Sequence, residues 1–403
     1  MRADGAGSPG VTAADGADVI VVGAGVAGLS LAWALAPHRK VVVLEREAAT
    51  AYHSSGRSAT YYHFGIGNRT VRLLTRASGA FFEQPPESFS EVPLARPAPA
   101  MMVVRAGQEA LFERNLAEMA AITGSAREID AREALARVPV LKVDTRPAGS
   151  PVPGEGITRA LIDPAAARLD GHALMAGYIA GLRRQGGRVL TEAEVLSVTR
   201  HAGRWAVHTS RGEFEAPVLV NAAGAWADAL AGLAGVAPLG LQPLRRTLIA
   251  FDGPAGVDVR GWPLVRSLAD EFYFLPESGR LLASPADQTP SPPCDAQPDE
   301  YDVALAAWRI EEVTTMRVHR VLHKWAGLRT FTADRVPVAG FAADAPGFFW
   351  CAGQGGYGLQ TAPALAQAAC SLITGRAWPE SLHAAGLGAE ALAPSRVQDT
   401  PSP

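Results

Sequence analysis

The stretch Asp18-Val-Ile-Val-Val-Gly-Ala-Gly-Val-Ala-Gly28 decides the fold of this 403-residue chain. Its β-branched run, Val19 to Val22, predicts a buried strand that leads into a glycine-rich turn. In the Gly-x-Gly-x-x-Gly pattern, Gly23 permits the tight turn, Gly25 lets a phosphate approach the backbone, and Gly28 lets the next helix pack close to the strand. The pattern predicts a site for a dinucleotide, with its phosphates at the helix N-terminus.

A second strand completes this nucleotide-binding unit. Apolar residues at helical spacing run from Leu29 to Leu35, and Lys40-Val-Val-Val-Leu-Glu45 then predicts a parallel neighbour for the first strand. Glu45 ends that strand at the spacing where an acidic residue binds ribose hydroxyls, and it disfavours a 2′-phosphate. The small polar residues of Tyr52-His-Ser-Ser-Gly-Arg-Ser58 suit a cofactor that extends past the sheet, although His53 also fits an ordinary loop position.

Composition and charge exclude several classes of protein. The formal net charge of -3 gives no basic footprint of the kind that binds nucleic acid. No apolar run approaches the roughly 18 residues that a membrane helix needs. Cys294, Cys351 and Cys370 show neither metal-ligand spacing nor a redox pair, so we expect no bound metal and a reduced, cytoplasmic setting.

The rest of the chain predicts a second domain inserted between segments of the first. We expect an α/β fold, with a Rossmann-like dinucleotide-binding domain of the glutathione reductase type and an inserted α+β substrate domain built on an antiparallel sheet. Residues 1–16 and 393–403 are expected to be disordered tails. The dinucleotide-binding segments are predicted as 17–62, 156–243 and 320–385, and the substrate-binding segments as 63–155 and 244–319.

Several long motifs carry a family resemblance that covers nearly the whole chain after residue 17. They are VVGAGVAGLS, VVVLEREA, YHSSGRSA, VNAAGAW, AGLAGVAPLGLQP, WAGLRTF and GFFWCAGQGGYGLQT. They resemble the D-amino-acid oxidase superfamily of FAD-dependent oxidoreductases, and within it the bacterial D-arginine dehydrogenases. The resemblance implies FAD as the cofactor. No cysteine or histidine stands in the WAGLR segment, where some sarcosine oxidases attach flavin, so non-covalent binding is expected.

The resemblance also implies which residues contact FAD. Val195 is expected to contact adenine through its backbone, and Gly355 to Gly358 to lie against the pyrimidine end of the flavin ring. A helix starting near Leu359 would direct its positive N-terminus at that end, where hydride transfer creates negative charge. The expected contacts are Gly23, Gly25, Gly28, Glu45, Arg46, Ser54, Ser58, Ala59, Val195, Gly355, Gly356, Tyr357, Gly358, Gln360 and Thr361.

The implied substrate is an amino acid, whose carboxylate needs a fixed cation. Arg329, in the WAGLR segment, matches the family arginine that binds this carboxylate in a bidentate fork. Tyr273 and Arg246 match positions that assist it, although Arg245 adjoins Arg246. The protein would orient Cα for hydride transfer to flavin N5, and the imine product would hydrolyse to a 2-oxo acid and ammonia.

Two departures from the D-arginine dehydrogenases concern amine deprotonation and the lid. Tyr61 stands where those enzymes have a histidine, and His63, two residues on, is a candidate substitute. Ile66 replaces their loop tyrosine over the pocket, between Gly65 and Gly67, which still permit a mobile lid.

The expected wall of the side-chain pocket differs as well. Ala100 stands where the D-arginine dehydrogenases have a glutamate that pairs with the substrate guanidinium, and Arg266, near Leu264, replaces an aliphatic residue. A buried cation without its partner is strongly disfavoured, so we predict that neutral D-amino acids are preferred over D-arginine. If Arg266 faces the pocket instead of pairing with Asp270 or Glu271, D-glutamate or D-aspartate is the alternative.

The electron acceptor stays open at this stage. A D-amino-acid dehydrogenase would pass electrons to a quinone or another carrier, whereas an amine oxidase of the glycine or sarcosine type would pass them to oxygen. A third interpretation is a flavin-binding protein without turnover, which Arg329 and Tyr273 disfavour. An NAD-linked dehydrogenase conflicts with the segment Gly353-Gln-Gly-Gly-Tyr-Gly358.

Overall fold

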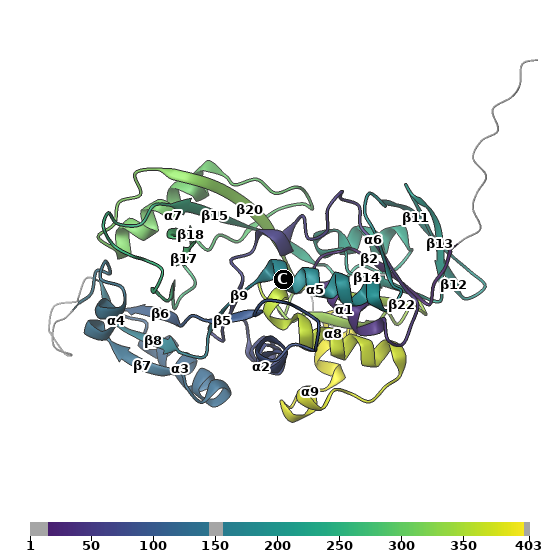
Figure 1. The fold of residues 1–403 in the computed structure, drawn as a ribbon, viewed down its shortest axis with the longest axis horizontal. Coiled ribbons are helices and arrows are strands. Elements are labelled where there is room, and N and C mark those ends of the chain that lie inside the picture. Colours follow the sequence, from purple (N-terminus) through teal and green to yellow (C-terminus); the bar gives the residue numbers. More distant parts are fainter. Residues whose placement is uncertain (1–14, 145–155, 399–403) are drawn as a thin grey trace, which may run out of the picture.

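The computed structural model describes residues 15–144 and 156–398. Two regions lie side by side in Figure 1, one around a parallel sheet and one around a larger mixed sheet. The mixture of parallel sheet, covering helices and a second sheet confirms the predicted α/β class. The helices beside the parallel sheet are α1 (Val26–Leu35), α5 (Gly171–Arg184) and α8 (Gly358–Thr374), and those beside the mixed sheet include α4 (Ala131–Arg137) and α7 (Glu300–Val313).

The parallel sheet is formed by β-branched and aromatic runs that are buried on both faces. Side chains of its central strand alternate between two cores: Val19 and Val21 pack with α1 and α8, and Ile20 and Val22 pack on the opposite face. Every neighbouring pair is parallel except the last. In order, the strands are β10 (Arg188–Leu190), β3 (Val41–Leu44), β2 (Val19–Val22), β14 (Val218–Asn221), β22 (Phe348–Ala352) and β21 (Val338–Phe341).

A small sheet covers the face of the parallel sheet that the three helices leave free. Trp205, Val207 and Phe214 pack from it against Trp350 of β22 and its neighbours. Helix α6 (Ala227–Leu233) contributes to the same core. The strands of the small sheet are, in order, β1 (Asp15–Gly16), β13 (Gly212–Ala216), β12 (Arg204–Thr209) and β11 (Val195–His201).

The mixed sheet has nine strands, and all of its pairs are antiparallel except β16 with β6. One face packs on α7 and α4, and the other face turns toward the parallel-sheet region. The main path is β19 (Thr289–Pro290), β15 (Gln242–Phe251), β18 (Arg280–Ser284), β17 (Tyr273–Glu277), β16 (Leu264–Ser267), β6 (Ala100–Arg105), β8 (Ile157–Asp163) and β7 (Arg127–Asp130), with β20 (Val321–Phe331) beside β15.

The remaining elements connect and cover these sheets. Strands β4 (Tyr61–Tyr62), β9 (Ala167–Leu169) and β5 (Ala95–Pro97) form a short antiparallel sheet between the two regions. The other helices are α2 (Arg69–Glu83), α3 (Glu109–Thr123), α9 (Glu380–Ala384) and α10 (Ser395–Gln398), with single turns at η1 (Ser54–Arg57), η2 (Gly224–Trp226) and η3 (Ala389–Leu392).

Two strands pair differently from the expectation drawn from the sequence. β8 and β20 belong to the mixed sheet, although their segments were predicted to be part of the dinucleotide-binding domain. The cause is long-range pairing: β8 fills the gap between β6 and β7, and β20 follows β15 over most of its length. The boundaries of the two domains remain a proposal.

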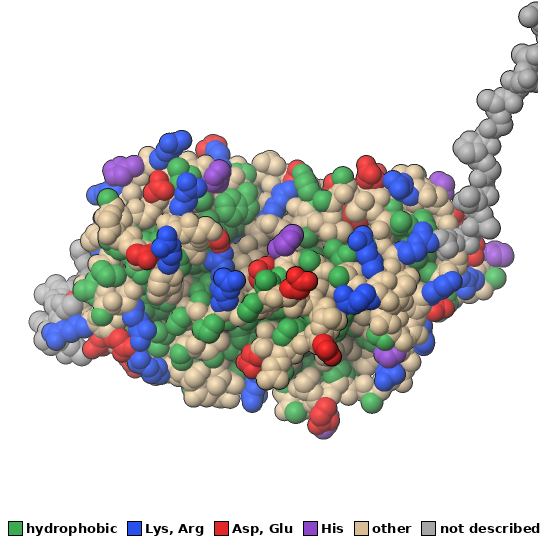
Figure 2. Space-filling model, viewed as in Figure 1, with side chains coloured by type: hydrophobic (Ala, Val, Ile, Leu, Met, Phe, Trp, Pro, Cys, Tyr) green, Lys and Arg blue, Asp and Glu red, His purple; other side chains and the backbone are tan. Residues whose placement is uncertain are grey.

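The chain beyond Leu392 also differs from expectation. Residues 393–398, predicted as part of a disordered tail, are ordered, because Val397 is buried and Arg396 bonds to Asp334 and to the carbonyl of Pro337. The rest of both predicted tails, 1–14 and 399–403, lies outside the described residues. Within the described ranges, every helix is too short or too polar to cross a bilayer. Basic and acidic side chains are interspersed over the face drawn in Figure 2.

Candidate active site

The glycine-rich loop between β2 and α1 is held by backbone contacts that exclude larger side chains. Gly23 has a positive φ of 107°, and a Cβ at this position would lie 2.4 Å from the carbonyl oxygen of Ala222. A Cβ on Gly28 would lie 1.9 Å from the carbonyl oxygen of Gly23. Gly25 instead meets only the Ser55 hydroxyl, at 3.3 Å, and lines a cavity. Gly23 and Gly28 therefore shape the turn, whereas Gly25 leaves room beside the start of α1.

Glu45 supports this loop from the end of β3. Its carboxylate accepts hydrogen bonds from the backbone N–H groups of Ala24, at 2.7 Å, and Glu47, at 2.9 Å. Each carboxylate oxygen has a second acceptor site, so hydroxyl binding and loop support are compatible. Arg46 is less well placed for a cofactor, because its guanidinium stacks over Trp226 at 4.4 Å and pairs with Glu47.

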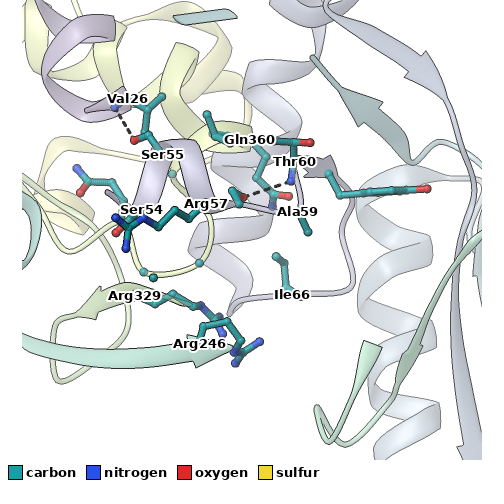
Figure 3. A pocket seen from close by; sticks show the side chains of 18 of the residues that line it. Val26, Ser54, Ser55, Arg57, Ala59, Thr60, Ile66, Arg246, Arg329 and Gln360 are labelled. Atoms are coloured by element: carbon teal, nitrogen blue, oxygen red, sulfur yellow. Dashed lines mark hydrogen bonds between the residues drawn. The ribbon is translucent and has the colours of Figure 1, made fainter. Parts of the chain in front are cut away.

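A cavity begins at the N-terminus of α1 and runs between the loop after η1, strand β20 and the cavity face of the mixed sheet. Figure 3 shows this cavity. Its cofactor-side wall consists largely of glycine, alanine and serine, so that a flat group can lie against the backbone. The predicted residues that line the cavity are Gly25, Ser54, Ser58, Ala59, Tyr61, His63, Ile66, Arg246, Leu264, Arg266, Tyr273, Arg329, Gly355, Gly356, Gly358 and Gln360.

The other predicted site residues lie outside the lining. Ala100 is fully buried beside its register partner Leu264, on the same face of the sheet, and does not line the cavity. Val195 begins β11 at the edge of the small sheet. Those not lining the cavity are Gly23, Gly28, Glu45, Arg46, Val195, Tyr357, Thr361 and Ala100.

Helix α8 directs its N-terminus toward the cavity. No side chain caps it, and Gly355, Gly356 and Gly358 line the cavity with backbone. A Cβ on Gly356 would lie 2.3 Å from Nη2 of Arg329, so this glycine permits the guanidinium to pack on the loop. A helix N-terminus carries positive partial charge and exposed N–H donors, which suit the electron-rich edge of a flavin ring.

Gln360, expected to contact the cofactor, lines the cavity and also connects three segments of the chain. Its amide joins α8 to two other segments, by donating to the His63 carbonyl at 3.2 Å and to Thr75 Oγ1 at 2.8 Å. Its oxygen accepts from the His63 N–H at 3.3 Å. Because these bonds use most of its capacity, Gln360 holds the segment that carries His63 in place.

Arg329 is a buried cation without a polar partner among the described residues. Its Nε and Nη1 groups form no hydrogen bond, and its guanidinium lies 5.3 Å from the centre of the Phe331 ring. Burial lowers the pKa of Arg329 to about 10, and repulsion from Arg246 acts in the same direction. Figure 3 shows Arg329 and Arg246 side by side, pointing into the cavity. A buried, unpaired guanidinium is costly unless an anion completes it.

Two further arginines occupy the same face of the mixed sheet, and each has an aspartate. Arg246 donates from Nε to the Asp287 carbonyl at 2.8 Å, while its Nη2 has no partner among the described residues. Arg266 donates from Nη2 to Asp270 at 2.9 Å. Arg266 therefore does both things that the sequence left open: it pairs with Asp270, and it lines the cavity.

Asp270 also lines the cavity, and sequence reasoning had assigned it only as an ion-pair partner. It occupies the left-handed region, with φ 57°, in the turn between β16 and β17. Burial acts to raise the pKa of Asp270, but Arg266, Arg246 and neighbouring arginines together hold it below its ordinary value. Asp270 is thus ionised at neutral pH, and it is the only carboxylate among the cavity-lining residues that the structure describes.

His63 is buried and faces the cavity. Burial holds the pKa of His63 well below its ordinary value, and repulsion from Arg266 adds to this effect. The backbone N–H of Gly65 donates to Nδ1 at 3.2 Å, which assigns the proton of the neutral ring to Nε2. This arrangement favours a hydrogen-bond donor over a base that accepts a proton from the substrate amine. For Tyr61, burial raises the pKa to about 12, so its hydroxyl is also a donor.

The sequence did not indicate that the side chains of Ser55 and Arg57 help to hold the site together. The Ser55 hydroxyl accepts from the Val26 N–H at 2.9 Å, and so bonds to the first turn of α1. Arg57 donates to the carbonyls of Ala296 and Ala326. Only the composition of the segment Ser54-Ser-Gly-Arg-Ser58 signalled their importance, since their partners lie far away in sequence. The described part of the chain contains no cluster of side chains that could hold a metal ion.

Comparisons with known proteins agree with this geometry. The family model DAO, described as FAD dependent oxidoreductase, matches residues 18–372. Human mitochondrial dimethylglycine dehydrogenase is 26% identical over 280 residues, which cover 67% of this chain and 30% of that protein. L-2-hydroxyglutarate dehydrogenase of Escherichia coli K12 is 28% identical over 233 residues, which cover 55% of this chain and 50% of that protein. The chain thus spans half or less of these relatives' length.

Solved structures with the same fold cover nearly the whole chain. L-proline dehydrogenase from P. horikoshii has a TM-score of 0.81 at 19% identity, with 96% of this chain and 98% of that chain covered. Glycine oxidase from Geobacillus kaustophilus has a TM-score of 0.76 at 20% identity, with 90% and 95% covered. At these identities the similarity shows the fold.

Proposed function

Because the chain belongs to the DAO family of FAD-dependent oxidoreductases, we propose that it oxidises the amine-bearing carbon of a small D-amino acid. The products would be the 2-oxo acid and ammonia. The observation that carries this proposal is Arg329, a buried guanidinium with no polar partner among the described residues, beside the glycine loop that starts α8. A fixed cation at that place suits the α-carboxylate of an amino acid.

FAD is the cofactor, and the residues present fit it. Gly23 and Gly28 shape the loop at α1, Gly25 leaves the space for phosphate, and Glu45 stands beside the loop. When bound, FAD supplies the hydride acceptor. Non-covalent attachment remains part of the proposal: none of the three cysteines is among the described cavity-lining residues. Acid or heat denaturation should then release about one FAD per chain into solution, and flavin retained on the precipitate would contradict this.

The chain's own residues would bind and orient the substrate. Arg329 would hold the carboxylate in a bidentate fork, with Arg246 and the Tyr273 hydroxyl as additional donors. His63 and Tyr61 are both neutral donors at neutral pH, so we propose that neither removes the amine proton and that water does so. The α8 N-terminus would stabilise negative charge at the pyrimidine end of the flavin. Orientation then supplies most of the rate enhancement.

A second candidate is an amine oxidase or dehydrogenase for N-substituted glycines. It is favoured by the similarity to dimethylglycine dehydrogenase and to the glycine oxidase fold. The electron acceptor, a quinone, another carrier or oxygen, distinguishes a dehydrogenase from an oxidase. A cytoplasmic location remains a prediction from the cysteine content.

One experiment tests both candidates. The purified flavoprotein is mixed without oxygen with D-amino acids, their L-enantiomers, glycine, sarcosine and dimethylglycine, and bleaching of the flavin absorbance is followed. Faster bleaching by D-enantiomers supports the first candidate, and faster bleaching by N-methylated glycines supports the second. If no amine reduces the flavin, both are wrong. Reoxidation of the bleached protein by air or by a soluble quinone then identifies the acceptor class.

A further inference from the structure

The cavity face of the mixed sheet holds more unused cationic donors than one carboxylate can satisfy. A guanidinium has five N–H groups. Within the described part of the chain, Arg329 makes no hydrogen bond or ion pair, and Asp270 is the only such partner of Arg266. Arg246 has Asp287, but its Nη2 is buried and unpartnered. A bidentate carboxylate on Arg329 would use two N–H groups and leave most of the others unpaired.

The three arginines are arranged in a row across the sheet. Arg329 lies on β20, Arg246 on the neighbouring β15, and Arg266 on β16, where it is paired directly with Tyr273 of β17. Arg246 is the middle member, because its charge acts on both of the others. Burial lowers the pKa of Arg329, and repulsion from Arg246 lowers it further. Burial also lowers the pKa of Arg266, where Asp270 opposes the shift and repulsion from Arg246 adds to it. Between β20 and β16 lie β15, β18 and β17, so the strands that carry the outer arginines are roughly 20 Å apart at about 4.8 Å per strand.

That separation suits two anionic groups rather than one. Arg329 and Arg266 line the same cavity from strands that three other strands separate, so two anionic groups joined by a short chain can meet both guanidinium groups. Arg329 and Arg246 can share the α-carboxylate because they lie on adjacent strands, in register pairs Leu244–Arg329 and Arg246–Gly327. Arg266, farther along the row, remains for a group at the other end of the substrate.

We propose that the substrate carries a second carboxylate on its side chain, and that Arg266 is the residue that binds it. This inference rests on the proposed function and selects amino dicarboxylic acids, such as glutamate and aspartate, from the wider class. Asp270 positions the guanidinium by holding Nη2, which leaves Nε and Nη1 for the substrate. The apolar residues Leu248, Leu264 and Ile66 line the same cavity and suit the methylene groups of such a substrate.

The aspartates beside these arginines, Asp287 and Asp270, do not remove the preference for a substrate with a second carboxylate. Asp287 accepts hydrogen bonds from the backbone N–H and the hydroxyl of Thr247, and burial raises its pKa, so it is the weaker counterion. Asp287 is also not among the cavity-lining residues, whereas Arg246, Arg266 and Arg329 all are. On the face of the mixed sheet, the anionic substrate therefore meets three guanidinium groups and the carboxylate of Asp270, while the fourth cavity-lining arginine, Arg57, belongs to η1 and pairs with Asp295.

The test compares two substrates that differ in one charge. Glutamate and glutamine have nearly the same shape, so kcat/KM for flavin reduction is measured with both enantiomers of each in the wild type. We expect glutamate to exceed glutamine by about tenfold or more for the enantiomer that reacts, because a site with buried donors discriminates against a substrate that leaves them unpaired. In Arg266→Met this ratio should fall to about 1–3. The surface variant Arg260→Met should keep the wild-type ratio, since that side chain is 76% exposed.

A double variant serves as the control for misfolding of Arg266→Met. Arg266→Met leaves the half-buried carboxylate of Asp270 without its arginine, so the double variant Arg266→Met/Asp270→Asn removes both charges and should show the same lowered ratio. Equal rates with glutamate and glutamine in the wild type would overturn the inference while leaving the proposed function intact. A high ratio that survives in both variants would assign the second carboxylate to another residue. Failure of every amino acid to reduce the flavin would instead contradict the proposed function itself.

Discussion

The two walls of the cavity are built by different means. On the cofactor side, the loops at the start of α1 and α8 present backbone, and glycines exclude any side chain: a Cβ on Gly28 would come within 1.9 Å of a carbonyl oxygen. On the substrate side, the mixed sheet presents long buried cations, of which Arg329 has no polar partner among the described residues. The cofactor-side wall depends on glycines, which have no side chain to fill the space. The substrate-side wall depends on buried arginines whose charge needs an anionic ligand as partner. Steric changes should therefore damage the first wall, and charge changes the second.

The largest effect is expected at the glycine loop. Gly28→Ala should give a protein that binds no FAD, because the new Cβ overlaps the Gly23 carbonyl and moves the turn; overpacking of this kind costs about 1–3 kcal/mol or more. Gly25→Ala should separate folding from binding, since its Cβ meets only the Ser55 hydroxyl at 3.3 Å in the protein itself. We expect the Gly25 variant to unfold near the wild-type temperature and to bind FAD more weakly.

The control is Gly232→Ala in α6, where a Cβ meets nothing within 4 Å. Flavin absorbance after gel filtration and thermal unfolding of the apo protein measure the two effects. A Gly28 variant that binds FAD normally would show that the loop tolerates the extra atom and that the steric description of this wall is wrong.

The cofactor-side wall was also the easier of the two walls to predict from the sequence. The strand, the three glycines and Glu45 lie close together in sequence, so local patterns were enough to place them. Contacts between distant segments were not predictable in this way: Ser55 bonds to Val26, and β8 pairs with β6, although α3, β7 and α4 lie between them in the chain. Ala100 was expected at the pocket wall, but its neighbours on the same face of the sheet bury it completely, whereas Asp270 reaches the cavity from the turn between β16 and β17.

On the substrate wall, the largest charge effect is expected at Arg329. Arg329→Ala should lower kcat/KM by roughly two to four decades, since loss of a buried charge partner costs about 3–5 kcal/mol and each decade corresponds to about 1.36 kcal/mol. FAD content should be unchanged, because the side chain packs beside the α8 loop and does not form it. Arg260→Ala, at an exposed position, is the matched control. A variant within about threefold of wild type would place the carboxylate elsewhere.

The pH dependence of carboxylate binding is the next largest effect. Burial lowers the pKa of Arg329 to about 10, so its guanidinium is charged below that pH and loses its proton above it. Affinity for a simple carboxylate should therefore be constant near neutral pH and fall by about tenfold per pH unit above the folded-state pKa. A ligand without an amine is used, because the substrate amine titrates in the same range. Flavin absorbance reports the dissociation constant, and affinity unchanged to about pH 11 would contradict the lowered pKa.

The smallest effect concerns a side-chain hydroxyl within the cofactor-side wall. Ser55 Oγ accepts the Val26 N–H in the first turn of α1, as a capping residue does, although it belongs to a distant loop. Removing such a bond costs about 0.5–2 kcal/mol, so Ser55→Ala should lower the unfolding temperature by only about 1–2 °C in a chain of this size. Ser381→Ala is the control, because Ser381 is exposed on α9 and is not among the cavity-lining residues. If the Ser55 variant instead lost FAD completely, cofactor binding would depend on this hydroxyl as much as on the glycines, and the distinction between a backbone wall and a side-chain wall would no longer hold.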